Sequence, residues 1–199
     1  MRKIALFLRR HCFFAQTCRA MQCIRLVCDY LVDCPSPPTP PTNLRDKEKE
    51  FGWQSDLTWI RPHLYLSGER GASAPDLWET YNIHWIISIG YHPDTHWHHP
   101  DMQYMYVPIQ DSEKEPIHKY FVSTSKRIQS TTAKGKGVLV HCQFGQSRSP
   151  TIVAAHLMQV ERLGELSALK DIASRRANVR PNSDFRRQLQ EFQLTLGID

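Results

Sequence analysis

The stretch VLVHCQFGQSRSPT, residues 138–151, most constrains what this chain can fold into. Three β-favouring apolar residues, 138–140, run directly into His141 and Cys142. Arg148 lies six positions after Cys142, and a run of helix-forming residues begins beyond it. The stretch therefore predicts a buried strand, a tight loop and the start of a helix.

The predicted loop has the groups needed to hold a phosphate against a sulfur atom. Backbone N–H groups that point inward where a loop enters a helix favour an anion, and so does the positive end of the helix dipole. Arg148 adds a planar fork of donors that can bind two phosphate oxygens together. In this positive field we expect Cys142 to be a thiolate nucleophile at neutral pH. The alternative is a buried structural cysteine at a strand end.

The same residues resemble a known catalytic loop. His-Cys-x5-Arg-Ser resembles the active-site loop of the cysteine-dependent phosphatases, and HCQFGQSRS resembles that of the small dual-specificity protein phosphatases. The resemblance rests on the preceding strand, His141, Gly145, Ser149 and the following helix taken together. It covers about residues 55–195.

This resemblance implies a fold, a reaction and a binding loop. The implied fold is α/β, with a mostly parallel central sheet flanked by helices. The implied reaction is hydrolysis of phosphotyrosine and phosphoserine or phosphothreonine in proteins through a cysteinyl-phosphate intermediate. The implied phosphate-binding residues are Gln143, Phe144, Gly145, Gln146, Ser147 and Arg148.

The chain divides near residue 50 into a leader with its linker, 1–50, and a predicted catalytic domain, 51–199. Within the domain the patterns predict strands over 57–67 (a pair at the domain's edge), 83–89, 102–109 and 138–140. They predict helices over 74–82, 116–132, 150–161, 164–176 and 182–196. Alternating strands and helices predict a largely parallel sheet covered on both faces, with the ligand site at the carboxyl ends of the strands.

The leader is expected to be disordered or weakly helical. Its longest purely apolar run, Ile4–Leu8, is too short to span a membrane and is interrupted by two arginines. Its Arg-rich, acid-poor composition is also compatible with a mitochondrial transit peptide. The linker PSPPTPP, residues 35–41, is typical of a semi-rigid spacer and is a weak candidate contact for a partner protein.

Charge and cysteine content are unevenly distributed along the chain. Residues 1–50 hold nine Lys and Arg against five acidic residues, a net charge of +4, which leaves sixteen against fifteen, a net of +1, for the rest. A nearly neutral domain argues against a nucleic-acid surface. Five of the six cysteines lie in the first 34 residues, and Cys142 is the sixth. A lone catalytic thiol predicts a reducing compartment, the cytoplasm or nucleus, with the mitochondrion as the alternative, and it predicts sensitivity to peroxide.

The reaction needs an acid to protonate the departing oxygen. Asp111 directly follows the predicted strand ending VPIQ, and VPIQDSEKEPIHKYF resembles the segment that carries the general acid in the family. Asp111 is therefore the candidate acid. It could instead cap the next helix or be solvated, with Glu113 or Glu115 as rival acids.

Three further residues are candidates for roles around the nucleophile. The hydroxyl of Ser149 can stabilise the departing thiolate, or it can cap the helix. His141 is expected to hydrogen-bond the loop backbone and hold Cys142 in place, as the resemblance implies. Asn182 lies in RRANVRPNSDFRRQLQEF, residues 175–192, which resembles the closing segment of the family. Asn182 and the paired arginines, Arg175 and Arg176, are candidate supports for the loop or contacts to a second substrate charge, although the arginines could simply be solvated helix-end charges.

Two residues depart from the family pattern. Phe144 stands where many relatives have a small residue, and Gln146 replaces a commonly apolar one. These departures bear on substrate preference more than on the chemistry, because the backbone and Arg148 would hold the phosphate. The histidine-rich segment YHPDTHWHHPD is interpreted as a surface loop, and the predicted reaction needs no metal or cofactor.

Two other functions stay open from the sequence. The same chemistry could act on a phospholipid, glycan or RNA phosphate, although residues 143–147 carry no cation to meet additional phosphates. The domain could also capture phosphopeptides without turnover, although proteins of that kind usually lack the cysteine, the arginine or the acid. The predicted partner is therefore a phosphorylated protein substrate.

Overall fold

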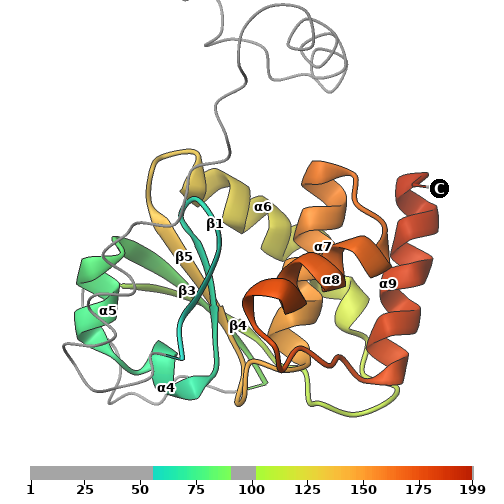
Figure 1. Ribbon diagram of the computed structural model, residues 1–199, viewed down its shortest axis with the longest axis horizontal. Coiled ribbons are helices and arrows are strands. Elements are labelled where there is room, and N and C mark those ends of the chain that lie inside the picture. The colour runs from blue at the N-terminus through green and yellow to red at the C-terminus, as the bar shows by residue number, and fades with distance from the viewer. Residues whose placement is uncertain (1–55, 91–101, 199) are drawn as a thin grey trace, which may run out of the picture. The chain divides into compact units, whose positions relative to one another are not determined.

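The computed structural model describes residues 56–90 and 102–198, where a five-stranded sheet lies between helices on both faces (Figure 1). Predictions for the leader, the linker and the histidine-rich segment fall outside these residues. The strands are β1 Thr58–Arg61, β2 Leu64–Ser67, β3 Ile83–Ile89, β4 Gln103–Val107 and β5 Gly137–His141. The helices are α4 Glu69–Ala72, α5 Pro75–Thr80, α6 Phe121–Thr132, α7 Arg148–Glu161, α8 Glu165–Arg175 and α9 Ser183–Leu196, with a 3-10 turn, η2, over Ile117–Tyr120.

The strand order in the sheet is β1-β2-β5-β3-β4. The pairs β2–β5, β5–β3 and β3–β4 are parallel, and β1 pairs antiparallel with β2 at one edge. The predicted mostly parallel α/β fold is therefore confirmed. β5 is the middle strand, so the residues that follow it emerge at the centre of one end of the sheet.

Alternate residues of β5 face two separate cores. Val138 and Val140 belong to the larger core, which lies beneath α6, α7, α8 and α9. Leu139, between them, belongs to the smaller core with Trp78 of α5. Burial on both faces explains why the strand reads as a continuous apolar run instead of an alternating one.

Most observed element boundaries differ from the predicted ones by one or two residues. α7 begins at Arg148, two residues before the predicted start. The predicted helix over 116–132 is a 3-10 turn followed by α6. α4 was not predicted, because four residues are too short to show a helical period.

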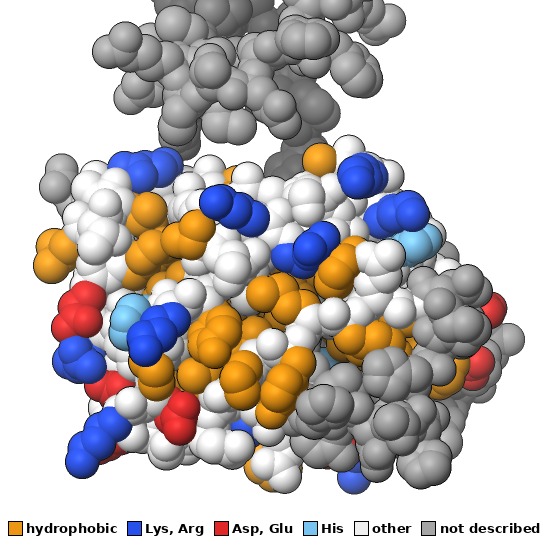
Figure 2. All heavy atoms as spheres, turned by 180° about the vertical axis from the view of Figure 1, so that it is seen from behind, with side chains coloured by type: hydrophobic (Ala, Val, Ile, Leu, Met, Phe, Trp, Pro, Cys, Tyr) orange, Lys and Arg blue, Asp and Glu red, His pale blue; other side chains and the backbone are white. Residues whose placement is uncertain are grey.

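Apolar side chains gather across the side of the molecule opposite to the view of Figure 1, with basic side chains among them (Figure 2). On β3 and α6, the guanidinium of Arg127 lies 3.8 Å from the ring centroid of Trp85. The arginine thus covers part of an aromatic ring that the core leaves half-buried.

Candidate active site

A cavity of about 430 Å³ lies where the loops after β4 and β5 meet the segment before α9. It is lined by Asp111, Cys142, Phe144, Gln146, Ser147, Arg148, Arg180, Pro181, Asn182 and Ser183. Most of the predicted site residues therefore share one cavity, at the carboxyl ends of the parallel strands. Gln143 and Gly145 do not line it.

Cys142 is a buried thiol whose sulfur has one side-chain hydrogen-bond partner. Only 2% of the residue is exposed, and the hydroxyl of Ser149 donates to Sγ at 3.2 Å. Ser149 does not cap α7: the N-cap residue is Ser147, and its side chain makes no capping hydrogen bond. The first turn of α7 therefore brings a hydroxyl donor to the sulfur.

The loop between β5 and α7 is held from outside through its carbonyl groups. The carbonyls of residues 143 and 146 accept hydrogen bonds of 3.0 and 2.7 Å from the backbone N–H groups of Glu69 and Arg180. The carbonyls of residues 144 and 145 accept bonds of 3.0 and 2.9 Å from the guanidinium of Arg176. Four consecutive carbonyls are thus engaged by donors from outside the loop.

This arrangement fixes where the N–H groups of the loop point. A trans peptide unit is planar, so the N–H of each residue points opposite to the carbonyl before it. The N–H groups of residues 144–147 therefore point away from the donors that bind those carbonyls. Gly145 makes the tight curvature feasible: its φ is +65°, and a Cβ there would overlap the guanidinium of Arg176 and the backbone of Ser67.

Arg176 is itself held by a carboxylate that sequence reasoning did not identify. Its Nη2 pairs with Oδ1 of Asp56 at 2.6 Å, and its Nη1 donates to the carbonyl of Asp56 at 2.9 Å. Asp56 also accepts a 2.7 Å bond from the N–H of Gly68. Arg176 thus makes the contacts to the loop that the predicted supporting role requires. Arg175 instead pairs with Asp171 and lies over the ring of Trp59.

Arg148 is buried with donor capacity to spare. The residue is 5% exposed, and its Nη1 donates to the carbonyl of Ile89 at 3.4 Å. Its buried Nε makes no hydrogen bond within 56–90 and 102–198. A buried donor without a partner costs about 1–3 kcal/mol, and an oxyanion in the cavity would satisfy it.

Gly90, at the end of β3, makes room for that guanidinium. Its φ is +70°, and a Cβ on it would overlap Nη1 of Arg148 and the carbonyl of Ile109. Sequence reasoning missed this residue. Its only signal is a glycine directly after a buried strand, at the end of the sheet where the site lies.

Asp111 faces the cavity with its two oxygens in different surroundings. Its Oδ1 accepts hydrogen bonds from the hydroxyl of Ser147 at 2.7 Å and from Nδ2 of Asn182 at 2.9 Å. Its Oδ2 lies 3.9 Å from Nε of Arg148. Two donors thus engage Oδ1, whereas Oδ2 faces the guanidinium of Arg148. The rival acid Glu113 instead accepts a bond from Ser183, and neither it nor Glu115 lines the cavity.

His141 is buried beside the nucleophile, and its Nδ1 donates to the carbonyl of Cys142 at 3.4 Å. Burial lowers its pKa from 6.5 to about 4 and outweighs the hydrogen bond to the carbonyl of Cys142 and the charge of Asp56, which raise it; the charge of Arg148 adds a smaller lowering. The ring is therefore neutral at pH 7.

A comparison with models of protein families shows which family the chain belongs to. The family model "Dual specificity phosphatase, catalytic domain" matches residues 64–195, from the start of β2 to the last turn of α9. The chain belongs to the dual-specificity phosphatase family. The expected family is therefore confirmed.

Individual dual-specificity phosphatases give the extent of the likeness. Human dual specificity protein phosphatase 7 is 32% identical over 140 residues, which are 70% of this chain and 33% of that protein. Mouse dual specificity protein phosphatase 15 is 38% identical over 136 residues, 68% of this chain and 57% of that protein. This chain thus spans only a third to about half of these relatives.

Solved structures match this chain over about 70% of its length. The crystal structure of DUSP15 has a TM-score of 0.66 at 32% identity, covering 72% of this chain and 96% of that one. A human tyrosine phosphatase-like serine/threonine/tyrosine-interacting protein has a TM-score of 0.65 at 26% identity, covering 71% of this chain and 98% of that one.

In the part of the chain that the structure describes, no helix has the length and apolarity needed to cross a membrane.

Proposed function

We propose that this chain hydrolyses phosphate monoesters of tyrosine and of serine or threonine in proteins, through a cysteinyl-phosphate on Cys142. The observation that carries the proposal is the orientation of the loop. Its carbonyls are bound by donors from outside the loop, so four backbone N–H groups, and the Nε of Arg148 that makes no hydrogen bond with the described residues, are left for an anion beside the sulfur. Membership of the dual-specificity phosphatase family supports protein phosphatase activity.

In the first step the thiolate of Cys142 attacks phosphorus. The S–P bond forms, the bond from phosphorus to the ester oxygen breaks, and Asp111 gives its proton to that oxygen. Oδ2 of Asp111 suits this role, because Ser147 and Asn182 already bind Oδ1. Arg148 and the loop N–H groups stabilise the charge on the three phosphate oxygens that do not leave.

In the second step water releases the phosphate. Asp111, now a carboxylate, takes a proton from the water as its oxygen bonds to phosphorus, and the S–P bond breaks. The sulfur leaves as a thiolate, and the hydroxyl of Ser149, 3.2 Å from Sγ, donates to the developing charge. The products are the free hydroxyl compound and inorganic phosphate. Both steps need a reduced Cys142, in keeping with the cytoplasm or nucleus.

Capture of phosphopeptides without turnover is the second candidate. Its support is the likeness to a human protein described as tyrosine phosphatase-like, at 26% identity. The grouping of thiol, arginine and carboxylate around one cavity favours catalysis over capture.

Hydrolysis of a small aryl phosphate by the full chain, with EDTA present, tests the proposal. We expect the wild type to turn over, Cys142→Ser to be inactive, and Asp111→Asn to be slower by about 100-fold or more, in the range typical of general acid catalysis. A wild type that binds phosphopeptide without turnover would leave only the capture function. Activity that persists in Cys142→Ser would exclude a cysteinyl-phosphate.

A further inference from the structure

Phe144 is an exposed aromatic residue on the wall of the active-site cavity. It lines the same cavity as Cys142, yet 63% of Phe144 is exposed, whereas Cys142 is 2% exposed. The two residues thus mark the outer and the inner part of one site. Other strongly exposed apolar residues of the described chain, such as Leu194 at 77% and Leu166 at 54%, lie on helices and do not line the cavity.

The backbone that carries this ring is fixed. The carbonyl of Phe144 accepts from Arg176, and Arg176 is paired with Asp56. The loop therefore fixes the backbone position from which the ring extends at the rim. An aromatic side chain held at the mouth of a polar site gives a flat apolar surface to whatever enters.

The rim also carries an arginine with no carboxylate partner. Arg180 is exposed, lines the cavity, and is tied to the loop by its N–H bond to the carbonyl of Gln146. Its neighbours in sequence all form ion pairs with acids: Arg175, Arg176, Arg186 and Arg187. Arg180 forms none with the described residues. Its planar cation is therefore available to stack on an aromatic ring.

Substrates differ in how far their phosphate extends from the peptide backbone. In a phosphotyrosine the aromatic ring lies between the peptide backbone and the phosphate, so with the phosphate at the sulfur its faces would contact the walls of the cavity. A phosphoserine or phosphothreonine has a short arm, so its backbone must descend to the rim, where the ring of Phe144 lies. The same side chain thus favours the long aromatic substrate and obstructs the short one.

We propose that Phe144, with Arg180, forms an aryl-binding wall that makes this enzyme prefer phosphotyrosine over phosphoserine and phosphothreonine. The proposal rests on the proposed phosphatase function. Within a family named for dual specificity, it assigns a substrate preference to one residue that departs from the family pattern.

The test is the ratio of kcat/KM for a phosphotyrosine peptide to that for the matched phosphothreonine peptide. The two leaving groups differ in reactivity, so the ratio of the wild type alone decides nothing, but leaving-group chemistry cancels when a variant is compared with the wild type. We expect Phe144→Ala to lower this ratio about tenfold, equivalent to about 1.4 kcal/mol. Phe144→Tyr should retain the ratio, and Arg180→Met should lower it by about threefold.

Leu194→Ala is the matched control, because it truncates an exposed apolar side chain outside the cavity and should leave the ratio unchanged. A ratio in Phe144→Ala within twofold of the wild type would overturn the proposal. If the wild type hydrolyses neither peptide, the proposed function fails, and binding then decides the inference. In a Cys142→Ser background, Phe144→Ala must weaken binding of the phosphotyrosine peptide more than that of the phosphothreonine peptide, and equal weakening refutes the aryl wall.

Discussion

The hydroxyl of Ser147 donates a 2.7 Å hydrogen bond to Oδ1 of Asp111, a residue 36 positions earlier in the chain. This bond joins the loop that holds the thiol to the loop that holds the acid. Ser147 in turn accepts a 3.3 Å bond from the N–H of Asn182. The relative position of nucleophile and acid is thus set by a few polar contacts among three loops.

Ser147→Ala should impair the acid more than the nucleophile. Loss of one hydrogen bond, about 1–1.5 kcal/mol, should lower kcat/KM about tenfold for phenyl phosphate, whose leaving group needs a proton. The loss should be much smaller for p-nitrophenyl phosphate, whose leaving group departs without one. Steady-state kinetics with the two esters checks this, and equal losses would mean that Ser147 acts on phosphate binding and not through Asp111.

Asn182 has two functions that substitutions can separate. Its Oδ1 accepts a 2.9 Å bond from the N–H of Phe185 and caps α9, while its Nδ2 binds Asp111. Asn182→Ala removes both and should lower activity and the melting temperature, the latter by roughly 2–4 °C for about 1 kcal/mol of capping energy. Asn182→Asp keeps the cap but places a carboxylate against Asp111. It should therefore melt like the wild type yet remain impaired in kcat, and a fully active Asn182→Asp enzyme would contradict this.

Gly90→Ala should disable the phosphate-binding arginine. The added methyl group would overlap Arg148 on a backbone whose φ of +70° already disfavours side chains, so the guanidinium must move. We expect the inhibition constant of vanadate or inorganic phosphate to rise at least tenfold. Gly135→Ala is the control: its φ is +69°, but a Cβ there meets nothing within 4 Å. Similar effects of the two variants on phosphate binding would exclude a specific effect on Arg148.

Arg176→Lys should loosen the loop although it preserves the charge. A single ammonium group cannot replace a guanidinium that donates to two loop carbonyls and to Asp56. We expect kcat/KM to fall about 10- to 100-fold, with weaker binding of inorganic phosphate. Arg175→Lys, one position earlier, changes a residue that pairs with Asp171, and it should keep near wild-type activity. Equal losses in the two variants would mean that local charge, and not the loop contacts, is responsible.

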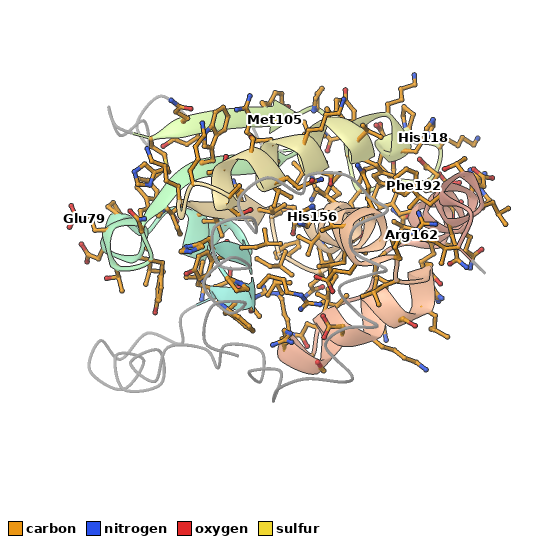
Figure 3. The ribbon with its side chains drawn as sticks, turned by 90° about the horizontal axis from the view of Figure 1, so that it is seen from above. Glu79, Met105, His118, His156, Arg162 and Phe192 are labelled. Atoms are coloured by element: carbon orange, nitrogen blue, oxygen red, sulfur yellow. The ribbon has the colours of Figure 1, made fainter. Side chains whose placement is uncertain are left out.

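A buried histidine should make the stability of the domain depend on pH. His156 lies in the interior between α7 and α6 (Figure 3), where its Nδ1 is 2.9 Å from Oγ of Ser125. Burial lowers its pKa from 6.5 to about 4, with Arg61 acting in the same direction and Glu161 against it. Between these values the unfolded chain binds a proton that the folded chain does not. The free energy of unfolding is therefore fully present above pH 6.5 and falls on acidification toward pH 4.

His156→Gln removes the imidazole that binds this proton but keeps a polar side chain beside Ser125. The slope of the free energy of unfolding against pH, measured by urea denaturation between pH 6.5 and pH 4.5, should decrease by up to about 1.4 kcal/mol per pH unit. Part of the slope remains, because His141 is shifted in the same direction. An unchanged slope would show that His156 titrates alike in the folded and unfolded chains.

The sequence predicts those parts of this protein whose signal is local. Each of three features is a contiguous stretch of sequence: the run 138–140, the loop from Cys142 to Arg148, and the strand before Asp111. Hydrophobic periodicity and a short motif therefore locate β5, the loop and β4.

The supports of the site could not be predicted in this way. Asp56 binds Arg176, which lies 120 positions later in the chain and donates to the loop carbonyls. Gly90 matters because a Cβ there would overlap the guanidinium of Arg148 and the carbonyl of Ile109. Arg180 shows no chemical difference from its neighbours in sequence. It differs from them in its position at the rim and in having no acidic partner among residues 56–90 and 102–198. Such roles arise from packing between distant segments, which no local pattern encodes.

The order of strands in the sheet also has a consequence for synthesis of the chain. β5 lies between β2 and β3, which the ribosome makes earlier, and the loop after β5 depends on Arg176 and Arg180, which it makes later. Cys142 is therefore translated before the arginines that hold its loop. Synthesis of the cysteine and completion of the phosphate site are separate events. A chain released before residue 176 would have the thiol but lack the arginine that binds the loop carbonyls.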